Sequence, residues 1–170
     1  KKDDETKKPV LVAGTEFKIY DLDHKKYVEQ VTTYPTVTVH KSFFTDSQGY
    51  LILPKNLEIG HYRIEEVTAP DGYVVNKNYV EITVDSDTAY EVDGVSGDVI
   101  IEVSYEDQPV KGNLIVYKKG EMLSGFENDF IYKEQYLSGA EFEVRAAEDI
   151  CTPDHQKDAD GNRIVLYAKD

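Results

Sequence analysis

Apolar and polar residues alternate with a period of two through much of the chain. Successive side chains of a strand point to opposite faces of a sheet, so this pattern predicts strands that each bury one face. The segments between them carry turn residues, with Gly and Pro at 46–49 and 69–72 and Gly at 93–94 and 96–97. No stretch longer than about ten residues has helical spacing. We therefore expect an all-β fold, an antiparallel sandwich or barrel with strands at 16–20, 36–44, 50–53, 61–67, 79–85 and 99–107.

Two short sequences occur twice. AGTEFKI at 13–19 returns as SGAEFEV at 138–144, and the dilysine at 1–2 returns at 118–119. The two spacings differ by eight residues, which places an insertion in the second copy, most simply within 124–136. Repetition at the length of a domain predicts tandem modules.

The boundary between the modules is expected at Pro109-Val110-Lys111-Gly112, because proline cannot continue a central strand. The first module then covers 1–108 and the second 109–170. The second has only three strand-like stretches, at 113–119, 141–147 and 163–169. Three strands are too few to close a sandwich, so we expect an incomplete, N-terminal part of a second module.

Two acids fall on faces that the alternation makes apolar. The apolar face of 61–67 ends in Glu66, and that of 99–107 ends in Asp107. The first inward set is Tyr62, Ile64 and Glu66; the second is Val99, Ile101, Val103, Tyr105 and Asp107. Either these acids lie at strand ends where the side chains reach water, or the core holds carboxyl groups.

Burial of two carboxylates together is costly, and one response is a raised pKa that leaves a carboxyl neutral. A lysine in the same surroundings deprotonates for the same reason and becomes a nucleophile. Lysine, aspartate and glutamate held together in an apolar core therefore have the groups needed for an intramolecular amide, and their proximity favours its formation.

Three motifs occur in order along the first module: AGTEF at 13–17, YRIEEVTAPDGY at 62–73 and EDQP at 106–109. The second is similar to the Y-x-L-x-E-x-x-A-P-x-G-Y sequence of Cna B-type domains, the SpaA-like, prealbumin-like modules of Gram-positive pilins and surface adhesins. The first resembles their A-G-A-x-F strand and the third their closing N/D-x-P. The resemblance implies tandem immunoglobulin-like or prealbumin-like antiparallel β-sandwich modules, the second one incomplete.

The resemblance also implies an isopeptide bond between a first-strand lysine and a last-strand Asn or Asp, promoted by a buried glutamate. By position, Lys1 is the amine, Asp107 the acceptor and Glu66 the promoting acid, with Lys2 as the alternative amine. Because the acceptor is Asp rather than Asn, the leaving group is water rather than ammonia. Lys118 is the corresponding lysine of the second module and is expected to be unbonded, because the segment with its partner acid would lie beyond Asp170.

Composition narrows the choice of partners. The formal net charge is −14 and the pI about 4.6. Such an acidic surface argues against binding to the phosphates of nucleic acid and to anionic membranes.

Cys151 is the single cysteine, so no internal disulfide is expected, and the interpretation we prefer is an unpaired, partly buried thiol. No apolar run has the length of a membrane span. The abrupt ends of the sequence suggest a part of a longer protein.

Other chemistry is weakly indicated. Asp158, Asp160 and Asn162 resemble half of a calcium loop, but no glutamate closes it, and an exposed acidic hairpin is the favoured interpretation. The four histidines have no metal-binding spacing, and no nucleophile–base set or phosphate-binding loop is present. We expect no cofactor, no metal and no enzymatic activity other than autocatalytic bond formation.

The sequence and the resemblance together predict a structural stalk module of a cell-wall-anchored surface adhesin or pilin-like protein. Its location would be extracellular, at the cell wall or cell surface, and its partners the neighbouring modules of the same chain. The alternative is a module that binds a glycan or a host extracellular matrix protein. A third hypothesis, an accessory domain of a secreted enzyme, is disfavoured by the lack of a catalytic set.

Overall fold

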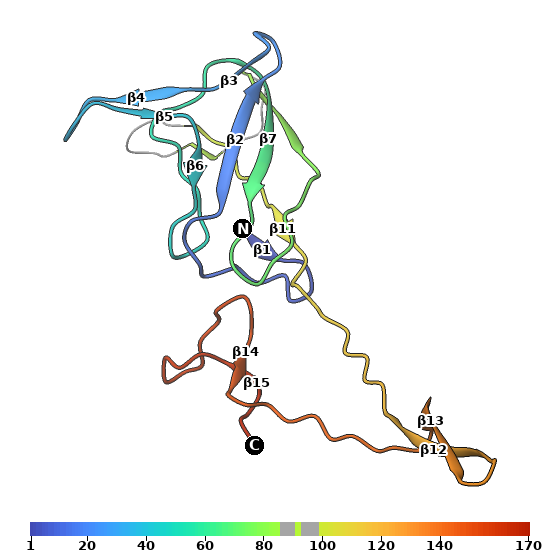
Figure 1. The fold of residues 1–170 in the computed structure, drawn as a ribbon. Helices are drawn as coiled ribbons and strands as arrows, with labels where there is room; N and C mark the ends of the chain where they lie inside the picture. Colours follow the sequence, from blue (N-terminus) through green and yellow to red (C-terminus); the bar gives the residue numbers. More distant parts are fainter. Residues whose placement is uncertain (86–90, 93–98) are drawn as a thin grey trace. The chain divides into compact units, whose positions relative to one another are not determined.

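The computed structural model describes residues 1–85, 91–92 and 99–170, and the predicted turns at 93–94 and 96–97 lie outside them. Every regular element within the described residues is a β-strand, as the alternation predicted (Figure 1). No helix there is long and apolar enough to cross a membrane. The strands are β1 (Lys2–Asp3), β2 (Glu16–Asp21), β3 (Lys26–Tyr27), β4 (Gln30–Thr32), β5 (Thr38–His40), β6 (Phe43–Phe44), β7 (Gly60–Thr68), β8 (Val80–Val84), β9 (Glu91–Val92), β10 (Val99–Ile100), β11 (Glu106–Asp107), β12 (Lys119–Phe126), β13 (Phe130–Tyr136), β14 (Ile150–Cys151) and β15 (Val165–Tyr167).

The chain divides into two compact units. The first consists of Lys1–Val110 together with Cys151–Leu166, and the second of Lys111–Ile150 together with Tyr167–Asp170. The chain thus leaves the first unit after Val110 and returns to it at Cys151.

The main sheet of the first unit is antiparallel and has the order β3-β2-β7-β8, with β6 paired to the start of β2. Strands β2 and β7 lie side by side over most of their length (Figure 1), with Ile19 opposite Ile64. A separate hairpin is formed by β4 and β5. Strands β1 and β11 form a parallel pair, which brings the N-terminus to the end of the first module.

The core of the first unit lies on the inner face of β2 and β7. Ile19, Phe43 and Tyr62 are buried together at its centre. Partly buried apolar side chains surround them: Val28, Leu51, Leu53, Leu57, Ile64, Ile82 and Val84. Burial alternates along β2, where Phe17, Ile19 and Asp21 are buried, as a strand with one face on the core requires.

Three predicted strands of the first module differ from the structure. The stretch 36–44 is divided into β5 and β6, and 50–53 forms no strand although Leu51 and Leu53 pack on the core. The stretch 99–107 is a ladder only at its two ends, in β10 and β11. Its alternation persists without the ladder, because Tyr105 and Asp107 are buried while Ser104 is exposed. In this stretch, apolar periodicity therefore predicted which side chains are buried, but it did not predict which backbone groups pair with another strand.

The strands predicted for 113–119 and 141–147 are wrong for nearly all of those residues. The ladder of the second unit is instead the hairpin of β12 and β13, within or next to the residues assigned to the insertion. The apolar side chains of the two predicted strands, such as Leu114, Ile115 and Val144, are exposed. A strand pattern needs a partner strand, and the described residues offer these segments none. The stretch 163–169 contains β15, which pairs with β14.

Candidate functional site

The pairing of β1 with β11 builds the site. Lys2 lies opposite Glu106 and Asp3 opposite Asp107 in parallel register. The Lys2 amide donates to the Tyr105 carbonyl at 2.8 Å, and the Asp4 amide donates to the Asp107 carbonyl at 2.8 Å. Residues more than a hundred positions apart in the sequence are thereby fixed side by side, next to the C-terminal end of β7 (Figure 1).

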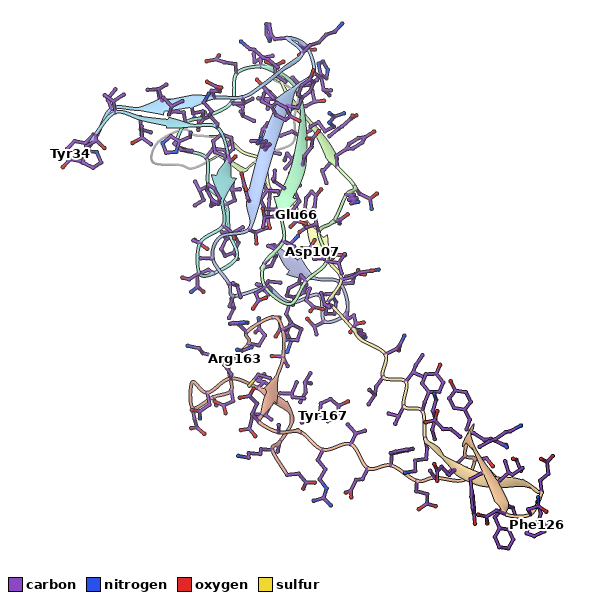
Figure 2. All side chains as sticks on the ribbon, in the orientation of Figure 1. Tyr34, Glu66, Asp107, Phe126, Arg163 and Tyr167 are labelled. Carbon is purple, nitrogen blue, oxygen red and sulfur yellow. The ribbon has the colours of Figure 1, made fainter. Side chains whose placement is uncertain are left out.

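Lys1 extends between the two acids singled out in the sequence. Its Nζ lies 2.6 Å from Oε1 of Glu66 and is also in contact with Oδ1 of Asp107. The Lys1 side chain is 1% exposed, and the side chains of both acids are 0% exposed. Figure 2 labels Glu66 at the end of β7 and Asp107 on β11 next to it. The acids do not reach water at strand ends, so that interpretation of the sequence is wrong.

The structure places Lys1, and not Lys2, between the acids. Neighbouring residues of an extended chain point to opposite faces, so only one of the two lysines can face Glu66. Sequence periodicity gave no basis for choosing, because β1 is only two residues long. Whether Lys1 and Asp107 are covalently joined stays a prediction.

Two aromatic rings enclose the lysine. Phe17 of β2 and Tyr105 meet edge to face, with ring centroids 5.2 Å apart. Lys1 Nζ lies 4.9 Å from the Tyr105 centroid and 5.7 Å from that of Phe17. An ammonium group is attracted to such ring faces, while the hydrocarbon around it excludes water. Tyr105 lies on the inward face predicted by alternation, and Phe17 is a buried residue of β2; their contact with the lysine was not anticipated.

Burial dominates the electrostatics of Asp107. Loss of water raises its pKa to about 6; Lys1 opposes this rise and the adjacent Glu66 adds to it. The Oδ2 atom of Asp107 is buried and accepts no hydrogen bond from the described residues. A carboxyl group in these surroundings is stabilised poorly as an anion, so its neutral form is favoured far more than in water.

Glu66 is held by a residue that sequence reasoning missed. The backbone amide of Asn76 donates to Glu66 Oε2 at 2.7 Å, which leaves Oε1 for Lys1. The side-chain amide of Asn76 donates to the Glu106 carbonyl at 2.7 Å, so one residue joins Glu66 to β11. The only available signal was that Asn often bonds to backbone groups in loops, which does not specify this partner.

A second buried polar pair fixes the turn after β1. The Tyr73 hydroxyl donates to Asp3 Oδ2 at 2.7 Å, and the amides of Glu5 and Thr6 donate to Asp3 Oδ1 at 2.8 Å each. Burial raises the pKa of Asp3, but these hydrogen bonds outweigh it and leave the pKa lowered. Burial, followed by the bond to Asp3, raises the pKa of Tyr73. Tyr73 ends the 62–73 motif, and Gly72 before it has a φ of +85° that favours glycine.

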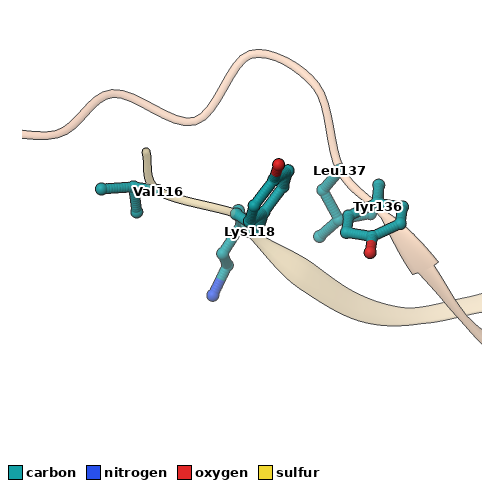
Figure 3. A pocket seen from close by; sticks show the side chains of 5 residues that line it. Val116, Lys118, Tyr136 and Leu137 are labelled. Atoms are coloured by element: carbon teal, nitrogen blue, oxygen red, sulfur yellow. The ribbon is translucent and has the colours of Figure 1, made fainter. Parts of the chain in front are cut away.

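The remaining candidates lie elsewhere. Lys118 is exposed in the second unit, beside Val116, Tyr117, Tyr136 and Leu137, and its amine points away from Tyr136 and Leu137 (Figure 3). Asp158 Oδ1 accepts the backbone amides of Asp160 and Asn162 at 2.9 Å each, so this carboxylate stabilises a turn. Within the described ranges no three His, Cys, Asp or Glu side chains gather as a metal-binding group. Cys151 is a free, half-buried thiol.

Comparison with known proteins identifies the first module. A family model described as SpaA, a prealbumin-like fold domain, matches residues 1–97, more than half of the chain. The match includes the 13–17 and 62–73 motifs, so the resemblance stated from them is confirmed, as is the prealbumin-like β-fold; the 106–109 motif lies outside it. No curated protein matches.

One solved structure with a significant match is the crystal structure of GBS52, a minor pilin of the Gram-positive pathogen Streptococcus agalactiae. The sequence identity is 19% and the TM-score 0.44. The match covers 68% of this chain and 44% of the pilin chain, so the chain spans less than half the length of that protein.

Proposed function

The chain belongs to the SpaA family of prealbumin-like fold domains, and we propose that it is a load-bearing stalk segment of a Gram-positive surface protein. Its first module would be closed by an isopeptide bond between Lys1 and Asp107, promoted by Glu66. The observation that carries the proposal is the fully buried contact of Lys1 Nζ with both carboxyl groups.

The bond forms by condensation. Glu66 passes a proton from the Lys1 ammonium to the Asp107 carboxylate, which gives a neutral amine and a neutral carboxyl group, and the amine attacks Cγ of Asp107. The new C–N bond forms as a C–O bond breaks, and proton transfers through Glu66 convert the departing oxygen into water. Glu66 ends in its starting state, so the sum is one ammonium and one carboxylate giving one amide and one water. Glu66 Oε1, 2.6 Å from Nζ, lies within reach for this proton transfer.

The site favours this condensation in three ways. The reacting groups are held in contact by the β1–β11 ladder, so little orientational freedom is lost on reaction. Burial raises the pKa of Asp107 and so disfavours its charged, unreactive form. Departure of one Asp107 oxygen also costs little, because Oδ2 accepts no hydrogen bond from the described residues.

The mechanical consequence follows from which strands are joined. The amide would connect the first residue of the module to its last strand, β11. Force entering at one end would then pass through covalent bonds to the other without loading the hydrogen bonds of the sheet. Such a tie also restricts the unfolded chain, as a disulfide does, and it needs no cysteine.

The proposed setting is the cell wall or cell surface of a Gram-positive bacterium, with neighbouring modules of the same chain as partners. We retain the division into modules at 1–108 and 109–170. No external substrate or cofactor is needed, because the only reaction is the chain's own condensation.

A purely structural role predicts that the chain binds nothing in an array of glycans and matrix proteins. Specific binding in that array would favour the alternative function, a ligand-binding module.

Tryptic peptide mapping is expected to recover a branched peptide in which the segment 78–111 is attached to the N-terminal lysines. Trypsin has no cleavage site within 78–110, so Asp107 is released in one identifiable piece. Fragmentation of the branched peptide should assign the bond to Lys1 rather than Lys2. In Asp107→Ala the same segment should be recovered unbranched. Recovery of unbranched 78–111 from the parent chain would contradict the bond.

A further inference from the structure

The hairpin of residues 151–166 belongs by sequence to the second module, but it lies within the compact unit built on residues 1–110. Its strands β14 and β15 are joined through a turn in which the Asp158 amide donates to the Asn162 carbonyl at 2.8 Å. The intervening excursion of the chain, 111–150, therefore starts from the first unit and ends on it.

Three hydrogen bonds attach this hairpin to the segment that follows β1. The Leu11 amide donates to the Asp154 carbonyl at 2.9 Å. The Thr6 hydroxyl donates to Asp154 Oδ2 at 3.3 Å, and Gln156 Nε2 donates to the Pro9 carbonyl at 2.6 Å. These contacts bridge more than 140 positions of sequence, so they are tertiary contacts between the two modules as the sequence defines them.

Burial is confined to the end of the hairpin that makes these contacts. Asp154 is 2% exposed, and its Oδ1 accepts the Gln156 amide at 3.2 Å, so both carboxylate oxygens have a donor. Pro153 packs on the turn of the 62–73 motif, where a Cβ on Gly72 would lie 3.5 Å from Pro153 Cβ. The opposite end, 157–163, is exposed. A buried carboxylate is tolerated only when it is hydrogen-bonded, so this end is built for a partner surface.

We propose that residues 151–166 form a clasp between modules, whose partner is the 6–11 segment of the first module. Asp154 is its central residue, because its main chain binds Leu11 and its side chain binds Thr6. The segment after β1 is then held at both ends, by Tyr73 through Asp3 and by the clasp through Thr6, Pro9 and Leu11. In this arrangement the second module stabilises the N-terminal segment of the first, whether or not the isopeptide bond is present.

Hydrogen exchange of the Leu11 amide in the full chain tests the clasp. Asp154→Ala removes the acceptor of Thr6 and is expected to accelerate exchange at Leu11 by about tenfold or more, because undocking exposes this amide to water. Amides in β2 and β7 should keep their protection. Asp160→Ala is the matched control, since it removes the same charge from the exposed end of the same hairpin, and it should leave Leu11 unchanged.

Unchanged exchange at Leu11 in Asp154→Ala, or an equal acceleration in Asp160→Ala, would overturn the proposal. If Asp154→Ala also accelerates β2 and β7, which indicates loss of the whole fold, the milder Gln156→Ala decides. That variant removes only the donor to Pro9. Faster exchange at Leu11 with β2 and β7 unchanged would support the clasp, and any other pattern would exclude it.

Discussion

When the chain is pulled from its two ends, the residues between Lys1 and Asp107 are expected to give no extension, because the proposed amide carries the force past them. In Glu66→Gln, which lacks the promoting acid, the same residues should unravel. At roughly 3.4 Å per residue over about 100 residues, they would add up to about 35 nm of contour length. Single-molecule force spectroscopy on the two chains measures this difference directly.

Glu65→Gln is the matched control for the pulling experiment. Glu65 is the preceding residue of β7 and faces the other side of the sheet, where it accepts the Tyr27 hydroxyl and pairs with Arg63. The same chemical change one position away should therefore extend like the parent. If the parent and Glu66→Gln release the same length, the first module is not covalently closed.

Glu66→Gln is also expected to be the most destabilising conservative change in the first module. A cross-link that closes a loop of about 100 residues contributes roughly 4 to 5 kcal/mol by restricting the unfolded chain. Loss of the bond should lower the free energy of unfolding by about that amount. Chemical denaturation, monitored at the backbone amides of β2 and β7, measures the change in the free energy of unfolding for the first unit alone.

The size of the decrease in the free energy of unfolding distinguishes a covalent bond from an ion pair. Glu65→Gln disrupts a partly exposed ion pair with Arg63, which contributes at most about 1 kcal/mol. A similar small loss in Glu66→Gln would indicate that Lys1 and the two acids interact only through charge and hydrogen bonds. A loss several times larger, absent from Glu65→Gln, fits the bond.

The alternation of apolar residues predicted the part of the site that depends on sheet faces. It placed Glu66 on the same face as Tyr62, and Asp107 on the same face as Tyr105, and all four are buried in the structure. A half-buried sheet imposes this relation, because a shift by one residue would move every side chain to the other face. Two acids on inward faces were therefore a usable sign of a buried site.

The alternation in the sequence carried no such signal for contacts between distant segments. Lys1 directly precedes the two-residue strand β1, which is too short to show periodicity, and its assignment came from the family resemblance alone. The bond from the Asn76 amide to Glu66 and the bond from Tyr73 to Asp3 depend on loop conformations that the alternation does not encode. The docking of Asp154 depends on tertiary contacts across most of the chain.

Alternation failed in the second unit because a pattern specifies a face only when another element covers it. The residues around Leu114 and Val144 have strand-like sequences, but their apolar side chains are exposed. The β12–β13 hairpin forms because its two strands are adjacent in sequence and can pair with each other. Local pairing thus decides the structure where long-range partners are absent from the described residues.

Intact mass spectrometry of the parent chain beside Asp107→Asn tests the central claim most directly. Condensation with Lys1 releases water from the aspartate and ammonia from the asparagine, so the two bonded products are the same molecule. We predict one identical mass for both chains, one water below the sequence mass of the parent, and an unshifted sequence mass for Glu66→Gln. Parent and Asp107→Asn chains that each retain their own full sequence mass would contradict the account.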